Sequence, residues 1–237
     1  MTRNILIIIF FFCLILSNLC CAKKSTIVTK NGFDANSSFS SSVNTFSPIE
    51  VSVHIRANKE NSDVRITYTP QKELDLVRVE FNGERIFKNE EIGNWVGFNH
   101  TTTFKKDNRL VLTSYNGNIR NEYVIEIPIK PLDFASEKIT DFDRNKTSLF
   151  QLSRAYDNEE SLHLEIFDSV IRRVNTDLNE TKDAIVFSPS IAQKMSLGSR
   201  KIVLNDFKQR FGMSDDGLVL FRYRTLYKSE MELEVTN

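Results

Sequence analysis

Three histidines, His54, His100 and His163, carry the side chains with the widest catalytic and metal-binding chemistry in this sequence of 237 residues. Their spacing contains no His-x-x-x-His pair, the arrangement with which one helix presents two imidazoles to a zinc ion. No Gly-x-Ser-x-Gly segment occurs among the eight glycines, so the turn that presents a serine nucleophile is also missing. The sequence therefore predicts no catalytic residue, no metal ligand and no cofactor, and we expect a protein that is not an enzyme. An enzyme whose polar residues converge in an unfamiliar cleft is the alternative.

The acidic segment Asp141-Phe-Asp143-Arg-Asn145 repeats the first three ligand positions of a calcium-binding loop. Alternate oxygen atoms in such a loop converge on one cation. Lys146 stands where the loop requires glycine and Leu152 where it requires a bidentate glutamate, which excludes an EF-hand. A looser calcium site between two domains and a solvated acidic linker are the two interpretations left open.

Two aromatic residues, Trp95 and Phe98, are the candidate ligand-binding residues of the chain. They lie in the segment 93–100, where glycines flank the tryptophan. Exposed aromatic faces can stack on a sugar ring, so the pair could form a platform for carbohydrate. A single tryptophan in a β-sandwich often fills the core between the sheets instead. The two interpretations predict opposite exposures for Trp95.

The three cysteines, Cys13, Cys20 and Cys21, all lie near the N-terminus. The sequence beyond Ala22 contains none, which excludes disulfide bonds and thiolate ligands from the predicted folded part. Cys20 and Cys21 are the candidate lipid-attachment residues, because bacterial lipoproteins are cleaved just before a cysteine that then carries acyl chains. The segment 17–20 matches that cleavage signal only in part, since a large residue stands where a small one is usual. Ordinary cleavage after Ala22, without a lipid, is the competing interpretation.

An unbroken apolar run over residues 5–16 follows Arg3. Crossing a bilayer takes roughly 20 apolar residues, whereas the core of a signal peptide takes about 7 to 15. We therefore expect residues 1–22 to be a signal peptide and the protein to be exported to the periplasm, the outer membrane or the extracellular space. An uncleaved anchor or a buried strand is the alternative.

Residues 23–47 are rich in serine, asparagine and threonine and show almost no periodic apolar pattern. Such a segment buries too little apolar surface to offset the entropy lost on ordering. It predicts either a flexible spacer that holds a folded module away from a surface or a disordered terminus.

From Pro48 onward, apolar and polar residues alternate with the two-residue period of half-buried strands. The clearest runs are 49–55, 64–68, 77–81 and 123–129. Asn82-Gly83 and Asn116-Gly117 interrupt such runs, and both residue types tolerate the positive φ of a tight hairpin turn. About seven short strands in some 80 residues are typical of an immunoglobulin-type β-sandwich.

The hairpin over residues 109–119, Arg-Leu-Val-Leu-Thr-Ser-Tyr-Asn-Gly-Asn-Ile, resembles the last two strands of bacterial immunoglobulin-like domains. The resemblance covers Pro48 to Lys130 and implies a bacterial exported protein with tandem immunoglobulin-like domains, a class that includes lipoproteins. The cysteine pair of that family is absent, so only its cysteine-free members are relevant. The resemblance implies no single function, because such domains serve adhesion, spacing, carbohydrate contact and assembly alike.

The second half of the chain predicts another β unit. Residues 131–146 combine proline with scattered acidic residues and are expected to be a linker, and alternating runs mark 147–237 as the second domain. Ser190-Ile-Ala-Gln193 has the form of a capping box, which predicts about two helical turns stopped by Gly198. The expected fold is all-β, with two consecutive immunoglobulin-like β-sandwich domains over 48–130 and 147–237 and at most one or two short helices.

Charge limits the partners. The 31 basic residues balance the 31 acidic ones, which disfavours nucleic acid. The signal, the spacer and the alternating strands predict a non-catalytic binding, adhesion or structural module of the cell envelope, with a protein or glycan partner and, if a cysteine is acylated, membrane anchoring through an N-terminal lipid. A carbohydrate-binding module of a larger glycan-handling system is the alternative.

Overall fold

The computed structural model describes residues 22–26, 48–70, 75–92, 94–116, 119–157, 161–168, 173–174 and 177–237. Cys20 and Cys21, all but the last residue of the predicted signal peptide, and residues 27–47 of the predicted spacer lie outside the described residues. The described part of the chain is all-β with one short helix, which confirms the predicted fold class.

The strands form three sheets. The five-stranded sheet has the order β1 (Ala22–Thr26), β9 (Ile119–Pro128), β8 (Asp107–Asn116), β4 (Asp75–Phe81) and β5 (Glu84–Ile86). The nine-stranded sheet has the order β13 (Arg173–Val174), β12 (Ser161–Phe167), β16 (Gly198–Met213), β17 (Val219–Thr236), β2 (Ile49–Ala57), β3 (Asn61–Tyr68), β7 (Trp95–Thr103) and β6 (Glu90–Ile92), and β10 (Lys138–Asp143) pairs with β17 beside this path. The three-stranded sheet is β11 (Ser148–Gln151), β15 (Ala184–Phe187) and β14 (Asp177–Leu178), and the helix is α2 (Pro189–Ala192).

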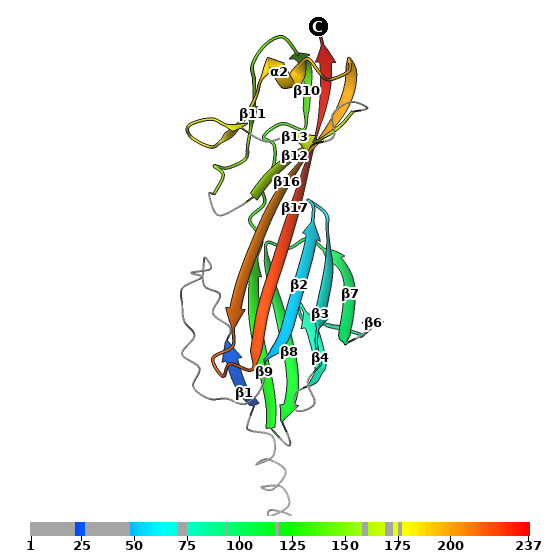
Figure 1. The fold of residues 1–237 in the computed structure, drawn as a ribbon, viewed down its shortest axis with the longest axis vertical. Helices are drawn as coiled ribbons and strands as arrows, with labels where there is room; N and C mark the ends of the chain where they lie inside the picture. Colours follow the sequence, from blue (N-terminus) through cyan, green and yellow to red (C-terminus); the bar gives the residue numbers. More distant parts are fainter. Residues whose placement is uncertain are drawn as a thin grey trace, which may run out of the picture.

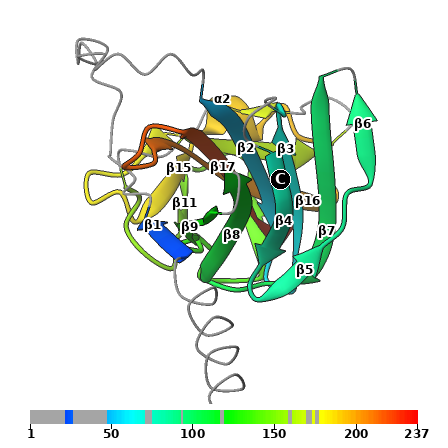
Figure 2. The same ribbon diagram turned by 90° about the horizontal axis from the view of Figure 1, so that it is seen from below.

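The first hydrophobic core lies between the five-stranded sheet and one end of the nine-stranded sheet, in the lower half of Figure 1. Every second side chain of a strand points to the same face, so the alternation of the sequence sends its apolar residues inward. In β2, Ile49, Val51, Val53 and Ile55 are all buried. Figure 2 looks along the long axis and shows the strands arranged around this interior. The opposite sheet contributes Val79, Phe81, Leu110, Leu112, Tyr123, Ile125 and Ile127.

The second hydrophobic core lies at the other end of the molecule and is rich in phenylalanine. Phe142, Phe150 and Phe187 form a cluster whose ring centroids are 5.2 to 5.8 Å apart. The nine-stranded sheet contributes residues of β12, β16 and β17 to this core. The three-stranded sheet and α2 contribute further residues to it. The helix contributes Ala192.

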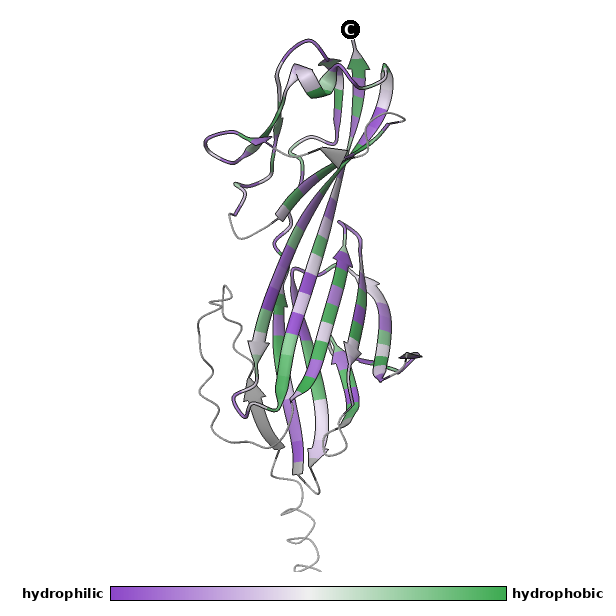
Figure 3. Cartoon of the chain, viewed as in Figure 1, coloured by the Kyte–Doolittle hydropathy of each residue, from purple (hydrophilic) through white to green (hydrophobic). Residues whose placement is uncertain are grey.

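One long hairpin serves both cores. Strands β16 and β17 pair from Gly198↔Val235 to Met213↔Leu220 and run through both halves of the molecule in Figure 1. The first part of β17 pairs in parallel with β2 and places Val219, Phe221 and Tyr223 in the first core. Its last part places Met231, Leu233 and Val235 in the second core. Figure 3 shows the same alternation of hydrophobic and hydrophilic residues along most of β17. Residues near the C-terminus therefore complete a sandwich that begins at residue 48.

The predicted turns can be compared directly with the backbone. Asn82 and Gly83 have φ values of 54° and 85°, which confirms the tight turn expected between β4 and β5. At the second Asn-Gly, the pair Asn116↔Ile119 closes the β8–β9 hairpin, and the two residues between them lie outside the described part of the chain. In β4 the register shifts between Leu76 and Arg78, so Val77 is 50% exposed although its position in the alternation predicted burial.

The second half differs from its prediction in two details. The expected two-turn helix is one turn long, since α2 covers only Pro189–Ala192 and the hydrogen bonds that follow it, from Lys194 N to Ile191 O and from Met195 N to Ala192 O, close turns of three residues. Ser188 is its N-cap, with no side-chain capping bond, and Gly198, at φ 95°, instead begins β16. The predicted linker 131–146 contains β10, which pairs in parallel with β17 and buries Phe142 in the second core.

Candidate binding site

The outer face of the nine-stranded sheet carries the polar residues that alternate with the buried apolar residues along its strands. Four adjacent strands, β17, β2, β3 and β7, align their outward residues in rows across the sheet. One row is Arg222, Ser52, Thr67 and Gly97. The next row is Arg224, His54, Arg65 and Asn99.

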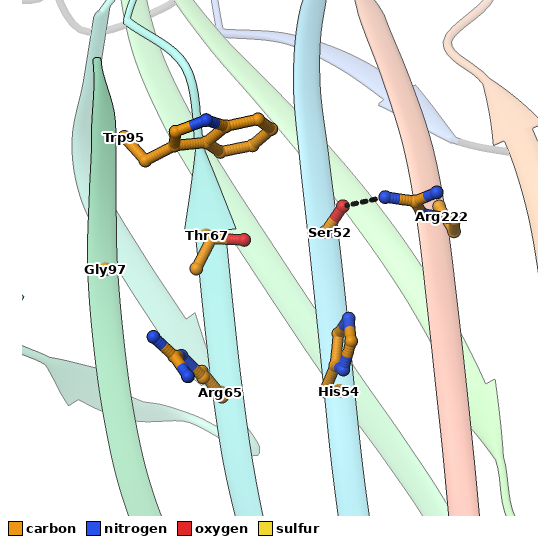
Figure 4. Close-up of a pocket in the computed structure, with 7 residues that line it drawn as sticks. All are labelled: Ser52, His54, Arg65, Thr67, Trp95, Gly97 and Arg222. Carbon is orange, nitrogen blue, oxygen red and sulfur yellow. Dashed lines mark hydrogen bonds between the residues drawn. The ribbon is translucent and has the colours of Figure 1, made fainter. Parts of the chain in front are cut away.

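A pocket of about 290 Å³ opens on these rows. It brings together side chains from four strands that span most of the described sequence (Figure 4). Its volume is near the lower limit for sites that hold a small organic ligand. The lining residues are Ser52, His54, Arg65, Thr67, Trp95, Gly97 and Arg222.

Trp95 forms one wall of the pocket and is 38% exposed. It lies at the start of β7, where Ile92↔Trp95 closes a short hairpin with β6. Figure 4 shows its indole reaching from β7 toward β3, above Thr67. Gly97, two residues further along the same face, has no side chain to fill the space below the ring. An open aromatic face of this kind is what a sugar ring or another flat apolar group stacks on.

Arg222 forms the opposite wall. Its Nη2 donates a hydrogen bond to Oγ of Ser52 at 3.2 Å, which joins two strands that are 170 residues apart in sequence. Its Nε is buried and has no hydrogen-bond partner among the described residues. Because a guanidinium offers five donors and no acceptor, the protein alone leaves part of its bonding capacity unused.

Arginine side chains gather around His54 on this face, although the whole chain has a net charge of zero. Partial burial lowers the pKa of His54 below its ordinary value of 6.5, and four surrounding guanidinium groups lower it further. Those groups belong to Arg224, Arg222, Arg65 and Arg56. His54 is therefore neutral at pH 7, and the fixed charge of the pocket comes from arginine.

The structure separates the two aromatic residues that the sequence paired. Phe98 is only 6% exposed and stacks on Tyr68 in the first core, with ring centroids 6.0 Å apart. Trp95 and Phe98 are three residues apart in one strand, so alternation places them on opposite faces. The tryptophan does not fill the core, and ligand binding by it stays a prediction.

The histidines and the acidic loop do not converge on one site. His100 Nε2 lies 3.1 Å from Glu84 Oε2, His163 contacts Ser161, and His54 lies in the pocket. In the acidic loop, the Lys146 ammonium lies 2.8 Å from Asp143 and lowers the pKa of that carboxyl group. Within the described residues, no group of three or more histidine, cysteine, aspartate or glutamate side chains could hold a metal ion.

Sequence reasoning missed the site residues Ser52, Arg65, Thr67 and Arg222, and Arg222 is the one most distant in sequence from the others. Its alternation with Phe221 and Tyr223 indicates only that it faces outward on a strand. Nothing local predicts that β17 lies beside β2, since that pairing joins the two ends of the described sequence. Trp95 was identifiable because it is the single tryptophan of the chain.

Comparisons with known proteins give no family. No family model matches the chain, and no curated protein matches its sequence. Among solved structures, tandem immunoglobulin repeats of Dlar are 8% identical, with 80% of this chain and 99% of that one covered and a TM-score of 0.27. An I-band fragment from titin is 7% identical over 80% of this chain and 66% of its own length, with a TM-score of 0.24.

A third similar structure comes from Bacteroides ovatus, a protein of a mixed-linkage glucan utilization locus in complex with a mixed-linkage heptasaccharide. It is 13% identical and covers 73% of this chain and 42% of its own, with a TM-score of 0.25. None of the three TM-scores reaches 0.5, and the three similarities say nothing more about this chain. In the part of the chain that the structure describes, no helix is long and apolar enough to cross a bilayer.

Proposed function

We propose that this chain is a non-catalytic binding module exported to the cell envelope, and that it contacts its partner through the outer sheet face around Trp95. The observation that carries this proposal is the open pocket itself, with a half-exposed indole on one side and arginine on the other. Tryptophan and arginine are the residue types that contribute most to recognition surfaces.

The chemistry of the lining residues favours binding over turnover. The seven residues include no carboxylate and no thiol. The Ser52 hydroxyl accepts a hydrogen bond from Arg222, and among the described residues no hydrogen bond joins it to His54 in the way a nucleophile is joined to its base. What the pocket offers is an apolar face, cations and hydroxyls, which can hold a ligand but supply no recognisable route for breaking its bonds.

The second candidate function is a carbohydrate-binding module of a larger glycan-handling system. The exposure of Trp95 favours it, because a sugar ring stacks on an open indole. Export through the signal peptide over 1–22, and attachment through a lipid on Cys20 or Cys21, remain part of the proposal. A module held near a membrane in this way would present the sheet face to glycans or proteins of the envelope.

The test compares wild-type protein with Trp95→Ala on a glycan array and in a pull-down from envelope extract. Thr101→Ala, an outward substitution on the same strand but outside the pocket, is the matched control. We expect binding that Trp95→Ala abolishes and Thr101→Ala preserves. Partners that bind both variants equally would place the contact surface elsewhere and contradict the proposal.

Anchoring is tested separately by the intact mass of the mature protein. Acyl chains on a cysteine at the new N-terminus support the lipid. An unmodified terminus at Lys23 would show ordinary cleavage after Ala22 and remove the lipid from the proposal.

A further inference from the structure

We propose that Asn145 carries an N-linked glycan. The segment Asn145-Lys146-Thr147 has the Asn-x-Thr pattern at which exported proteins are glycosylated. In this step the Asn145 Nδ2 forms a bond to the anomeric carbon of an oligosaccharide carried on a lipid diphosphate. The bond between that carbon and the diphosphate oxygen breaks, the lipid diphosphate leaves, and Nδ2 gives up one proton. The inference rests on the proposed export of the chain and adds a modification that the binding function does not assign.

Four segments of the chain have this pattern, and they begin at Asn36, Asn99, Asn145 and Asn179. Asn36 lies outside the described residues. The surroundings of the other three can be compared, because an acceptor amide must exchange one of its two N–H hydrogens for a sugar. The glycan is bulky and belongs on a surface loop, so the acceptor also needs an exposed position away from other contacts.

Asn145 lies in the turn between β10 and β11, and all three residues of its segment are exposed. Among the described residues, neither its Nδ2 nor the Thr147 hydroxyl makes a hydrogen bond. The hydrogen bonds of Asn145 use its other polar atoms. Its backbone N–H donates to Asp143 Oδ1 at 2.9 Å, and its Oδ1 accepts from Gln193 Nε2 at 3.3 Å. A glycan on Nδ2 therefore breaks no hydrogen bond in the described part of the fold.

Asn179 is the opposite case, because its side chain builds a turn. Its Nδ2 donates to Thr181 Oγ1 at 2.8 Å and to Asp183 Oδ1 at 2.6 Å. Its Oδ1 accepts from the backbone N–H groups of Asp183 and Ala184, each at 3.0 Å. The hydroxyl of the same segment is also engaged, since Thr181 donates to Asp183 at 2.6 Å. A glycan on Asn179 would take one of its two N–H hydrogens and so remove at least one bond of this turn.

Asn99 lies within β7, in the row of outward residues that borders the pocket. Its backbone N–H donates to Asn89 Oδ1 at 3.2 Å, and its Nδ2 lies 3.5 Å from the same oxygen. It faces outward two residues from Gly97, which lines the pocket. A glycan at Asn99 would therefore crowd the face that we propose for binding.

The turn of Asn145 lies in the other half of the molecule. In Figure 1, β10 and β11 lie in the half that holds the second core, whereas the pocket strands β2, β3 and β7 lie in the half that holds the first. Arg144 Nη2 donates to Asn237 Oδ1 at 2.7 Å, which places this turn beside the last residue of β17. A glycan at Asn145 leaves the sheet face around Trp95 open, so modification and binding are compatible.

The experiment expresses the full chain in cells that export proteins and glycosylate them at Asn-x-Ser/Thr. Peptide mapping of the exported protein, before and after an amidase that releases N-linked glycans and converts their asparagine to aspartate, locates the modification. We expect this conversion at position 145. Asn145→Gln and Thr147→Val should each lower the intact mass by one whole glycan, whereas Thr147→Ser should keep the glycan because serine retains the hydroxyl. Lys146→Gln is the matched control, since the pattern leaves the middle residue free, and it should also keep the glycan.

The outcomes separate this inference from the proposed function. An exported chain whose Asn145 is bare would overturn the inference and leave the binding face around Trp95 untouched. A glycan on Asn99 or Asn179 with a bare Asn145 would overturn it as well. If residues 1–22 stay attached and the chain stays inside the cell, the inference falls together with the export that the proposed function includes. The pull-down with Trp95→Ala tests binding in every one of these cases.

Discussion

Trp95 and Phe98 are close in sequence but lie in different environments, so replacing each with alanine should change the free energy of unfolding by different amounts. Phe98→Ala removes a ring from the first core and is expected to cost about 3 to 5 kcal/mol in free energy of unfolding. Trp95→Ala removes a half-exposed ring from the outer face and should cost about 1 kcal/mol or less. Chemical denaturation of both variants measures the difference. Equal losses would mean that the tryptophan is a core residue after all.

His54 reports the arginine side chains around it without any ligand. Because burial and the four arginines disfavour its protonated form, its titration midpoint by NMR should lie below 6.5, and Arg222→Gln should raise it. The unfolded chain binds this proton more readily, so stability falls as the pH drops from 6.5 through the lower folded midpoint, and His54→Gln should remove that part of the loss. A midpoint at or above 6.5 would contradict this arrangement of arginines.

At the scale of the elements, Tyr123 joins β9 to the turn between β16 and β17. Its hydroxyl is 3.1 Å from Asp216 Oδ2, and burial, with the Asp216 charge, raises the pKa of Tyr123 to about 12. The unfolded tyrosine ionises near pH 10, so the stability supplied by this group is lost between about pH 10 and 12. Tyr123→Phe should cost about 1 kcal/mol at pH 7 and show less of the alkaline loss. Melting curves at both ends of this range measure the effect.

The elements that the sequence predicted well are those set by local alternation. The inward face of β2 could be predicted from the alternating residues Ile49, Val51 and Val53, which are all buried. The turn after β4 could be predicted from Asn82-Gly83, and both signals lie within a short stretch of sequence. The partner of β2 on its other side is β17, and no local pattern encodes a pairing across 170 residues. Trp95 could be found from its residue type, whereas Arg222 could not be found because its place in the site depends on this distant pairing. The site is built by a long-range parallel pairing.

That pairing predicts the behaviour of a fragment. Residues 48–130 alone would leave β2 without its parallel neighbour and the first core without Val219, Phe221, Tyr223 and Tyr227. We expect such a fragment to give a poorly dispersed NMR spectrum and no cooperative melting transition, whereas residues 48–237 give both. A fragment 48–130 that melts cooperatively would show that the hairpin is dispensable for the first sandwich.

At the scale of the whole molecule, the two cores are connected by more than the hairpin. Arg154 donates to the Pro131 carbonyl at 3.0 Å and to Asp206 at 3.3 Å, so it ties the segment after β9 to β16. The Tyr227 hydroxyl is 3.1 Å from Asp133 Oδ1 and connects the same segment to β17. These contacts connect the region between the two cores to both strands of the long hairpin. We infer that the halves behave as one cooperative unit.

Trp95 allows this coupling to be measured, because the single tryptophan lies in the first half of the fold. Leu233→Ala removes a fully buried side chain from the second core and should cost about 2 to 5 kcal/mol. If β17 transmits this loss, the denaturation midpoint recorded by Trp95 fluorescence falls together with that recorded by circular dichroism. Leu112→Ala, in the first core, is the control that must shift both signals. We expect a common shift because a shared strand cannot leave one core without disturbing the other. A Trp95 midpoint that stays in place while the circular dichroism curve becomes biphasic would contradict this coupling and show that the two halves unfold independently.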